Sequence, residues 1–127
     1  MTTRKMILGG MGAMLLFGAG LMVGANKFGQ PKSVLHVVTV RWKADSTEAQ
    51  RKAAVDGVAK MAAELPGVKN VWLKTLKVQG ENYNAAFVME FADEAAFQAY
   101  ADSPAHKDWE KLYLAVRDRS TTHDITN

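Results

Sequence analysis

The sequence predicts an α+β domain in which helices cover one face of a four-stranded antiparallel sheet. Three observations lead to this prediction. Segments with strand and helix patterns follow each other in the order strand, helix, strand, strand, helix, strand. Pro104 divides the last helical segment into two pieces. The first strand is mostly apolar on both faces, as in a sheet that is covered on both sides.

An apolar segment precedes the domain. Met6 to Ala25 has no charged residue and six glycines, and it follows Arg4 and Lys5. Residues 1–25 therefore fit a cleavable signal peptide, with Val23-Gly24-Ala25 before the cut, or an uncleaved membrane anchor. Both alternatives predict an exported domain, either periplasmic or held to the membrane by residues 6–25. A linker is expected over 26–33 and the folded domain over 34–127.

The composition excludes several classes of function. The chain has no cysteine, so disulfides, thiolate chemistry and a lipid-attachment site are excluded. Leaving out Arg4 and Lys5, 14 basic residues stand against 13 acidic ones, which gives a net charge of +1. A nearly neutral domain with scattered lysines argues against nucleic-acid binding. We therefore expect no nucleic-acid partner, and membrane contact only through the N-terminal segment.

The first strand is predicted over Val34 to Lys43, where residues alternate between two faces. The face that we assign to the helix side carries Val34, His36, Val38, Val40 and Trp42. The first helix is predicted to open with a capping box formed by Asp45 and Glu48, and Pro66-Gly67 stops it.

A hairpin is predicted next, with strands over Val68 to Val78 and Asn84 to Phe91. Asp93 is expected to cap the following helix, which Pro104 interrupts.

The second piece of this helix is predicted over Ala105 to Val116. Its inward residues are Trp109, Leu112, Tyr113 and Val116. A short last strand is predicted over Ser120 to Thr126.

With short, right-handed connections, this order of elements gives a ferredoxin-like βαββαβ arrangement with a split second helix. Both helices then lie on one face of the sheet, and the opposite face is bare and largely apolar. An exposed apolar patch of that size is rare on a soluble monomer. We therefore expect a homodimer that packs through the open sheet face.

Short motifs in a fixed order resemble a known family. They are His36-Val37-Val38, Thr47-Glu48-Ala49-Gln50, Pro66-Gly67-Val68, Phe91-Ala92-Asp93-Glu94-Ala95-Ala96-Phe97 with Tyr100, and Pro104-Ala105-His106. Through them the sequence is similar to the stress-responsive dimeric α/β-barrel (A/B barrel) domains. The resemblance implies a homodimer whose two sheets close into a barrel, and a pocket between sheet and helices in each subunit.

The plant polyketide-cyclase branch of this family uses a tyrosine and a histidine as the acid/base pair of a cofactor-free aldol closure. The resemblance implies these roles for Tyr100 and His106, and it places a first-strand pocket histidine at His36. Two positions depart from the pattern. Ser103 stands where the family commonly has histidine, and Ala85 stands where the cyclase pocket has a strand histidine.

The candidate catalytic residues are therefore His106 and Tyr100, because enolisation needs a base of near-neutral pKa and a donor for the developing oxyanion. The same two residues also fit a structural role at the joint between the helices. The candidate pocket-lining residues are His36, Val38, Trp42, Phe97 and Trp109.

Three functional classes stay open. The first is a binding module for a small apolar or aromatic ligand, with the link to stress that the family implies. The second is a cofactor-free cyclase, lyase or isomerase, and a third alternative is an oxygenase on the same fold. We expect no cofactor. We also expect no metal, because the histidines His36, His106 and His123 form no short-spaced ligand pair.

Overall fold

The computed structural model describes residues 27–127, and residues 31–127 of it form a compact unit. The expected signal peptide or anchor, residues 1–25, lies outside the described part. Within 27–127, no helix combines the length and the apolar character that a membrane span requires.

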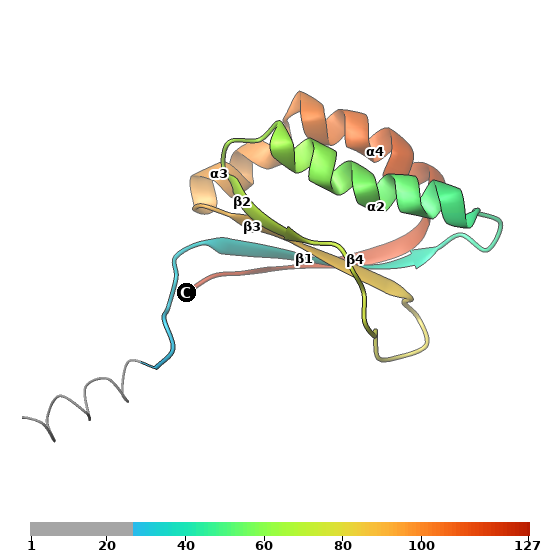
Figure 1. Ribbon diagram of the computed structural model, residues 1–127, viewed down its shortest axis with the longest axis horizontal. Coiled ribbons are helices and arrows are strands. Elements are labelled where there is room, and N and C mark those ends of the chain that lie inside the picture. Colours follow the sequence, from blue (N-terminus) through green and yellow to red (C-terminus); the bar gives the residue numbers. More distant parts are fainter. Residues whose placement is uncertain (1–26) are drawn as a thin grey trace, which may run out of the picture. The chain divides into compact units, whose positions relative to one another are not determined.

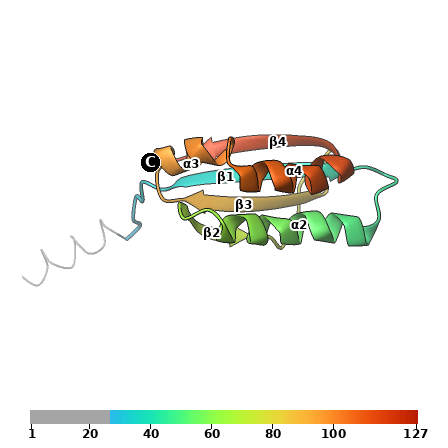
Figure 2. The same ribbon diagram turned by 90° about the horizontal axis from the view of Figure 1, so that it is seen from above.

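The predicted fold is confirmed. The elements are β1 (Val34–Trp42), α2 (Glu48–Ala63), β2 (Val68–Trp72), β3 (Ala85–Phe91), α3 (Glu94–Tyr100), α4 (Pro104–Val116) and β4 (Arg117–Ile125). The sheet has the order β2-β3-β1-β4 with antiparallel neighbours. The helices lie on one face of it (Figure 1). Seen from that side, α4 runs over the middle of the sheet and α2 over its β2 side, so β4 is the less covered edge (Figure 2).

The core fills the space between the helices and the sheet. Val34, Val38 and Val40 of β1 are buried there, as predicted for this face. Phe87, Met89 and Phe91 of β3, Ala54, Val58 and Met61 of α2, and Tyr100, Trp109, Tyr113 and Val116 complete it. Helices α2 and α4 approach closely because Gly57 has no Cβ, which would lie 3.0 Å from Cδ1 of Trp109. The indole Nε1–H of Trp109 donates to the Ala54 carbonyl across the same contact, at 2.8 Å.

The start of α2 differs from the prediction. Thr47 is the N-cap, its hydroxyl accepts from the Gln50 N–H, and the Gln50 side chain accepts from the Thr47 N–H. The capping box thus lies two residues beyond Asp45, because the chain first closes a turn in which the Ser46 N–H donates to the Lys43 carbonyl.

Two strands have other bounds than predicted. β2 ends at Trp72, because Thr75 binds β3 through its side chain instead of its backbone. Its hydroxyl donates to the Ala86 carbonyl and accepts from the Ala86 N–H, both at 2.9 Å. β4 begins at Arg117 and not at Ser120, since it follows α4 without a loop.

Leu112 of α4 does not point inward as predicted. It lies beside Gly57 of α2 and is 49% exposed, whereas Trp109, Tyr113 and Val116 form the buried face of α4.

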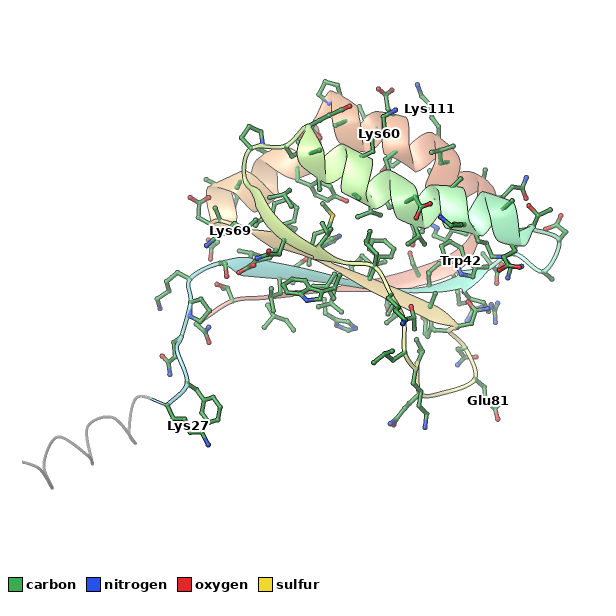
Figure 3. The ribbon with its side chains drawn as sticks, viewed as in Figure 1. Lys27, Trp42, Lys60, Lys69, Glu81 and Lys111 are labelled. Atoms are coloured by element: carbon green, nitrogen blue, oxygen red, sulfur yellow. The ribbon has the colours of Figure 1, made fainter. Side chains whose placement is uncertain are left out.

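The open face of the sheet is apolar along its middle. One cross-strand row runs through all four strands and consists of Trp72, Val88, Val37 and His123. The neighbouring pair Leu35 and Ile125 extends it. Trp72 is 52% and Ile125 is 54% exposed. Side chains project from the sheet on both of its faces (Figure 3), and no described segment covers this row.

Candidate functional site

A cavity of about 300 Å³ lies between the sheet and the α3–α4 pair. Six of the seven candidate residues, from β1 and the split helix, come together in its wall. These residues are His36, Val38, Phe97, Tyr100, His106 and Trp109. Its size is at the lower end of the range for ligand pockets, which run from about 300 to 1,000 Å³. The exposed lining is mainly apolar, with a few polar groups among it.

Trp42 does not line this cavity. It borders a separate hollow beside the start of α2, with Arg51 and Ala85. Two features of the fold separate it from the cavity: the register of β1 shifts between Arg41 and Trp42, and the ring of Tyr113 lies 6.2 Å from the Trp42 ring. Figure 3 shows Trp42 at the far end of the sheet.

The joint between α3 and α4 positions the candidate catalytic pair. Ser103 is the N-cap of α4, and its hydroxyl accepts from the His106 N–H at 3.1 Å. The same hydroxyl donates to the Tyr100 carbonyl at 2.7 Å. Pro104 occupies the first turn, where its missing N–H leaves no helical hydrogen bond unmade. One serine therefore connects the end of one helix to the start of the next, and it brings the rings of Tyr100 and His106 to 4.4 Å.

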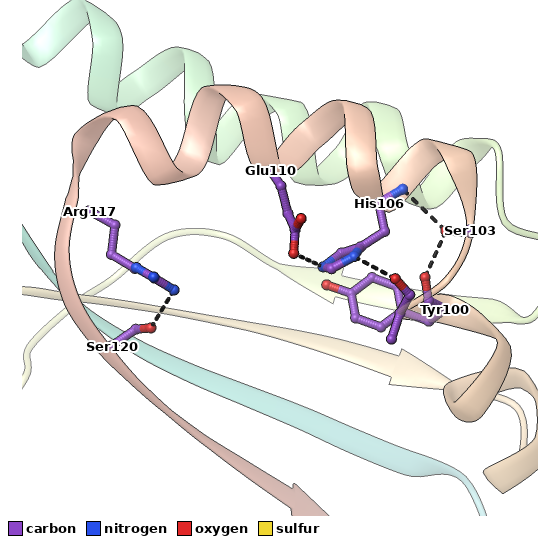
Figure 4. A network of polar contacts seen from close by, with 7 residues as sticks. Tyr100, Ser103, His106, Glu110, Arg117 and Ser120 are labelled. Carbon is purple, nitrogen blue, oxygen red and sulfur yellow. Dashed lines mark hydrogen bonds and ion pairs between the residues drawn. The ribbon is translucent and has the colours of Figure 1, made fainter.

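His106 is held in one orientation (Figure 4). Its Nδ1 lies 3.0 Å from the Ala101 carbonyl oxygen. Because a carbonyl only accepts, Nδ1 carries the proton, and the lone pair of the neutral ring is on Nε2. Nε2 lies 3.5 Å from Oε1 of Glu110. This arrangement places Nε2 in the cavity wall, next to the Glu110 carboxylate.

Tyr100 complements this base. Its side chain is 5% exposed, and burial, with a smaller effect of the Glu110 charge, raises the pKa of the phenol above its ordinary value. The phenol is therefore neutral at physiological pH and acts as a hydrogen-bond donor. The site then pairs one acceptor, Nε2 of His106, with one donor, the Tyr100 hydroxyl.

His36 is fixed in the same way from the sheet. Its Nδ1–H donates to the Asp124 carboxylate at 2.5 Å, and its ring lies 5.5 Å from that of Tyr100. Asp124 reaches it from β4, directly opposite on the neighbouring strand. His123 pairs with Val37 and thus lies on the open face. The three histidines therefore do not converge, and no metal-binding group of His, Cys, Asp or Glu occurs within residues 27–127.

The family model of the stress responsive A/B barrel domain matches residues 34–127. The chain belongs to this family. No protein with a curated description matches the sequence significantly.

Solved structures share the fold of this A/B barrel domain. A dimeric ferredoxin-like protein of unknown function from Thermobifida fusca is 23% identical, with a TM-score of 0.66 over 80% of this chain and 97% of that one. The hydroxynitrile lyase from Passiflora edulis is 17% identical, with a TM-score of 0.68 over 75% and 93%. SnoaB, a cofactor-independent oxygenase from Streptomyces nogalater, is 17% identical, with a TM-score of 0.59 over 76% and 93%.

The A/B barrel cavity also contains polar residues that the sequence reasoning missed. They are Gln98, Glu110, Arg117, Ser120 and Thr122. Glu110 had a readable signal, since a position four residues after His106 lies on the same helix face. No sequence signal pointed to Arg117 and Ser120, because the face of the sheet on which their side chains lie depends on where β4 begins.

Proposed function

We propose that this A/B barrel domain is a homodimer that binds a small apolar or aromatic molecule in the cavity under α3 and α4. The observation that carries the proposal is the cavity itself. Aromatic rings from β1, α3 and α4 form its walls, and only a few polar groups face it. Concave sites of this kind, apolar with a few fixed polar groups, are the usual form of small-molecule sites.

The test uses a matched pair of leucines on α4. Leu114 lines the cavity and is 43% exposed, whereas Leu112 lies outside it and is 49% exposed. We expect native mass spectrometry to find a small molecule on the wild-type protein. Leu114→Trp, which fills the mouth of the cavity, is expected to abolish it, and Leu112→Trp to leave it in place. Equal loss in both variants, or no bound molecule at all, contradicts the proposal.

A second candidate function is a cofactor-free lyase, cyclase or isomerase. It is favoured by the hydrogen bond from Nδ1 of His106 to the Ala101 carbonyl, which leaves Nε2 as the base. In this function Nε2 removes a proton from the carbon beside a substrate carbonyl, and the Tyr100 hydroxyl donates to the oxyanion that forms. That two structural relatives are named as a lyase and as a cofactor-independent oxygenase supports such chemistry on this fold.

Turnover of β-keto substrates separates the two functions. If the domain is an enzyme, His106→Ala is expected to lower kcat by about 10²- to 10⁴-fold, the usual contribution of a general base. Tyr100→Phe is expected to lower kcat with little change in KM. If no substrate is turned over and His106→Ala binds the ligand as well as wild type, the enzymatic function is wrong and the binding function stands.

We also propose that residues 1–25 export the domain, as a signal peptide or as a membrane anchor. The uncharged segment after Arg4 and Lys5 supports this. Fractionation of cells that express the full chain with a C-terminal tag tests it. The expected result is tagged protein in the periplasm or the membrane, and cytoplasmic protein when residues 1–25 are deleted. A full chain that stays in the cytoplasm overturns it.

A further inference from the structure

The cavity has a second polar end, away from the Tyr100–His106 pair. We infer that Arg117, Tyr113 and Ser120 there bind a carboxylate group of the ligand, so that the ligand class is aromatic or apolar monocarboxylic acids. This inference rests on the proposed binding function, and it adds the charged group that the ligand carries and the direction in which it lies.

The first observation is an unused donor. Tyr113 is 5% exposed, and its hydroxyl is the buried side-chain polar atom within residues 27–127 that has no hydrogen-bond partner. A buried hydroxyl without a partner is costly, and native proteins satisfy such groups as a rule. Tyr113 lines the cavity. Burial raises the pKa of this phenol, and the nearby Ser120 and Arg117 side chains partly oppose that effect, so the three polar groups lie together where a ligand acceptor would bind.

The second observation is an arginine without a carboxylate. Arg117 begins β4 directly after α4, and its guanidinium lies 5.5 Å from the centre of the Tyr113 ring. Its Nη1 donates to the Ser120 hydroxyl over a long 3.4 Å. Within residues 27–127 no acidic side chain forms an ion pair with it, in contrast to Arg41, which pairs with Asp118. A guanidinium offers several N–H donors in a planar fork that matches a carboxylate.

The charges around the cavity favour one carboxylate over a more highly charged group. Arg117 is the one permanent cation in the lining, and Glu110 contributes a negative charge on the side of His106. His36 is already bonded to Asp124. Glu110 repels any anion, but it repels a phosphate dianion about twice as strongly as a monoanion, and Arg117 balances only a single negative charge.

The positions of these groups fix how the ligand lies. Figure 4 shows Arg117 and Ser120 at one end, Tyr100 and His106 at the other, and Glu110 between them. A carboxylate at Arg117 places the apolar body of the ligand along Trp109. Its far end then reaches the phenol and imidazole, where any chemistry would take place.

The experiment compares three acids with their own amides on the full-length chain. The probes are benzoate, cinnamate and hexanoate, each with its carboxamide, and the dissociation constants are measured by calorimetry. Charge-assisted hydrogen bonds are roughly twice as strong as neutral ones, so at least one acid is expected to bind about ten-fold tighter than its amide. Arg117→Gln is expected to remove this advantage without weakening the amide, and Arg41→Gln to leave it unchanged.

Tyr113→Phe gives an independent reading, because it keeps the ring and removes only the unused donor. It is expected to weaken the acid about ten-fold, as loss of one hydrogen bond to a charged group does, and to leave the amide less affected. Acids and amides that bind alike, with no effect of Arg117→Gln, overturn the inference while the binding function stands. Inorganic phosphate that competes as well as the acid overturns the assignment to a carboxylate. If no probe binds and native mass spectrometry finds no ligand, the binding function fails and the inference with it.

Discussion

At the scale of single residues, two histidines in the cavity wall are each oriented by a hydrogen bond at one ring nitrogen, which leaves the other ring nitrogen to face the cavity. His106 is held through Nδ1 by Ala101, and His36 is held through Nδ1 by Asp124. Each imidazole thus keeps Nε2 available in its neutral form. Tyr113 differs from both, because its side-chain hydroxyl has no hydrogen-bond partner within the part of the chain that the structure describes.

This difference predicts the effect of Tyr113→Phe on stability. Replacing a buried hydroxyl that has no partner by an apolar group of the same shape is neutral or stabilising. We expect the free energy of unfolding of the ligand-free protein to stay the same or to rise by about 1 kcal/mol. Chemical denaturation measures it, and Tyr83→Phe in the loop between β2 and β3 is the control. A clear loss of stability in Tyr113→Phe would mean that the hydroxyl has a partner.

At the scale of elements, the sequence predicted every strand and helix but not all of their ends. Periodicity and turn residues reflect local preferences, and these gave the α+β class, the split at Pro104 and the helix-facing side of β1. The ends of β2 and β4 were wrong because they depend on long-range contacts, such as the Thr75 side chain on β3. The site residues also divide into those that local sequence patterns predict and those that depend on long-range contacts. His36 and Tyr100 came from sequence and resemblance, whereas Asp124 and Arg117 became visible only with the strand register.

The junction of α2 and β2 gives a prediction at this scale. A Cβ on Gly67 would lie 2.5 Å from the Cβ of Ala96 on α3, and the Gly67 carbonyl accepts from the Ala92 N–H at 2.8 Å. Because the Gly67 backbone cannot move away without breaking that bond, Gly67→Ala is expected to cost about 1–3 kcal/mol in unfolding free energy.

A double-mutant cycle with Ala96→Gly provides the control for Gly67→Ala. If the two Cβ atoms clash, the double variant is more stable than the sum of the single effects predicts. Additive effects in denaturant titrations would show that the loss at Gly67 has another cause.

At the scale of the whole molecule, the open sheet face is the surface through which we propose that the homodimer packs. The row from Trp72 to Val37 leaves an apolar stripe uncovered on three strands, Ile125 extends it onto β4, and similar structures are described as dimeric. Two such stripes packed together would remove both from water.

Val37 lies within this stripe, so Val37→Lys is expected to convert a dimer of residues 31–127 into a monomer at micromolar concentration. A lysine buried in an apolar interface has no partner and is strongly disfavoured. Sedimentation velocity measures the change. Ala63→Lys adds the same charge on exposed α2, away from the sheet, and is expected to leave the dimer intact. A wild-type monomer, or a Val37→Lys dimer, contradicts the assembly.

His106 lies in the first turn of α4, and Arg117 comes directly after the last. Eleven residues of helix, at about 1.5 Å of rise each, therefore set the separation between the imidazole and the guanidinium along α4. The two hydrogen bonds of the Ser103 hydroxyl keep the Tyr100 phenol and the His106 imidazole together whatever the length of α4. A homologue with one turn more or fewer in α4 would keep its acid/base pair and accept a correspondingly longer or shorter acid.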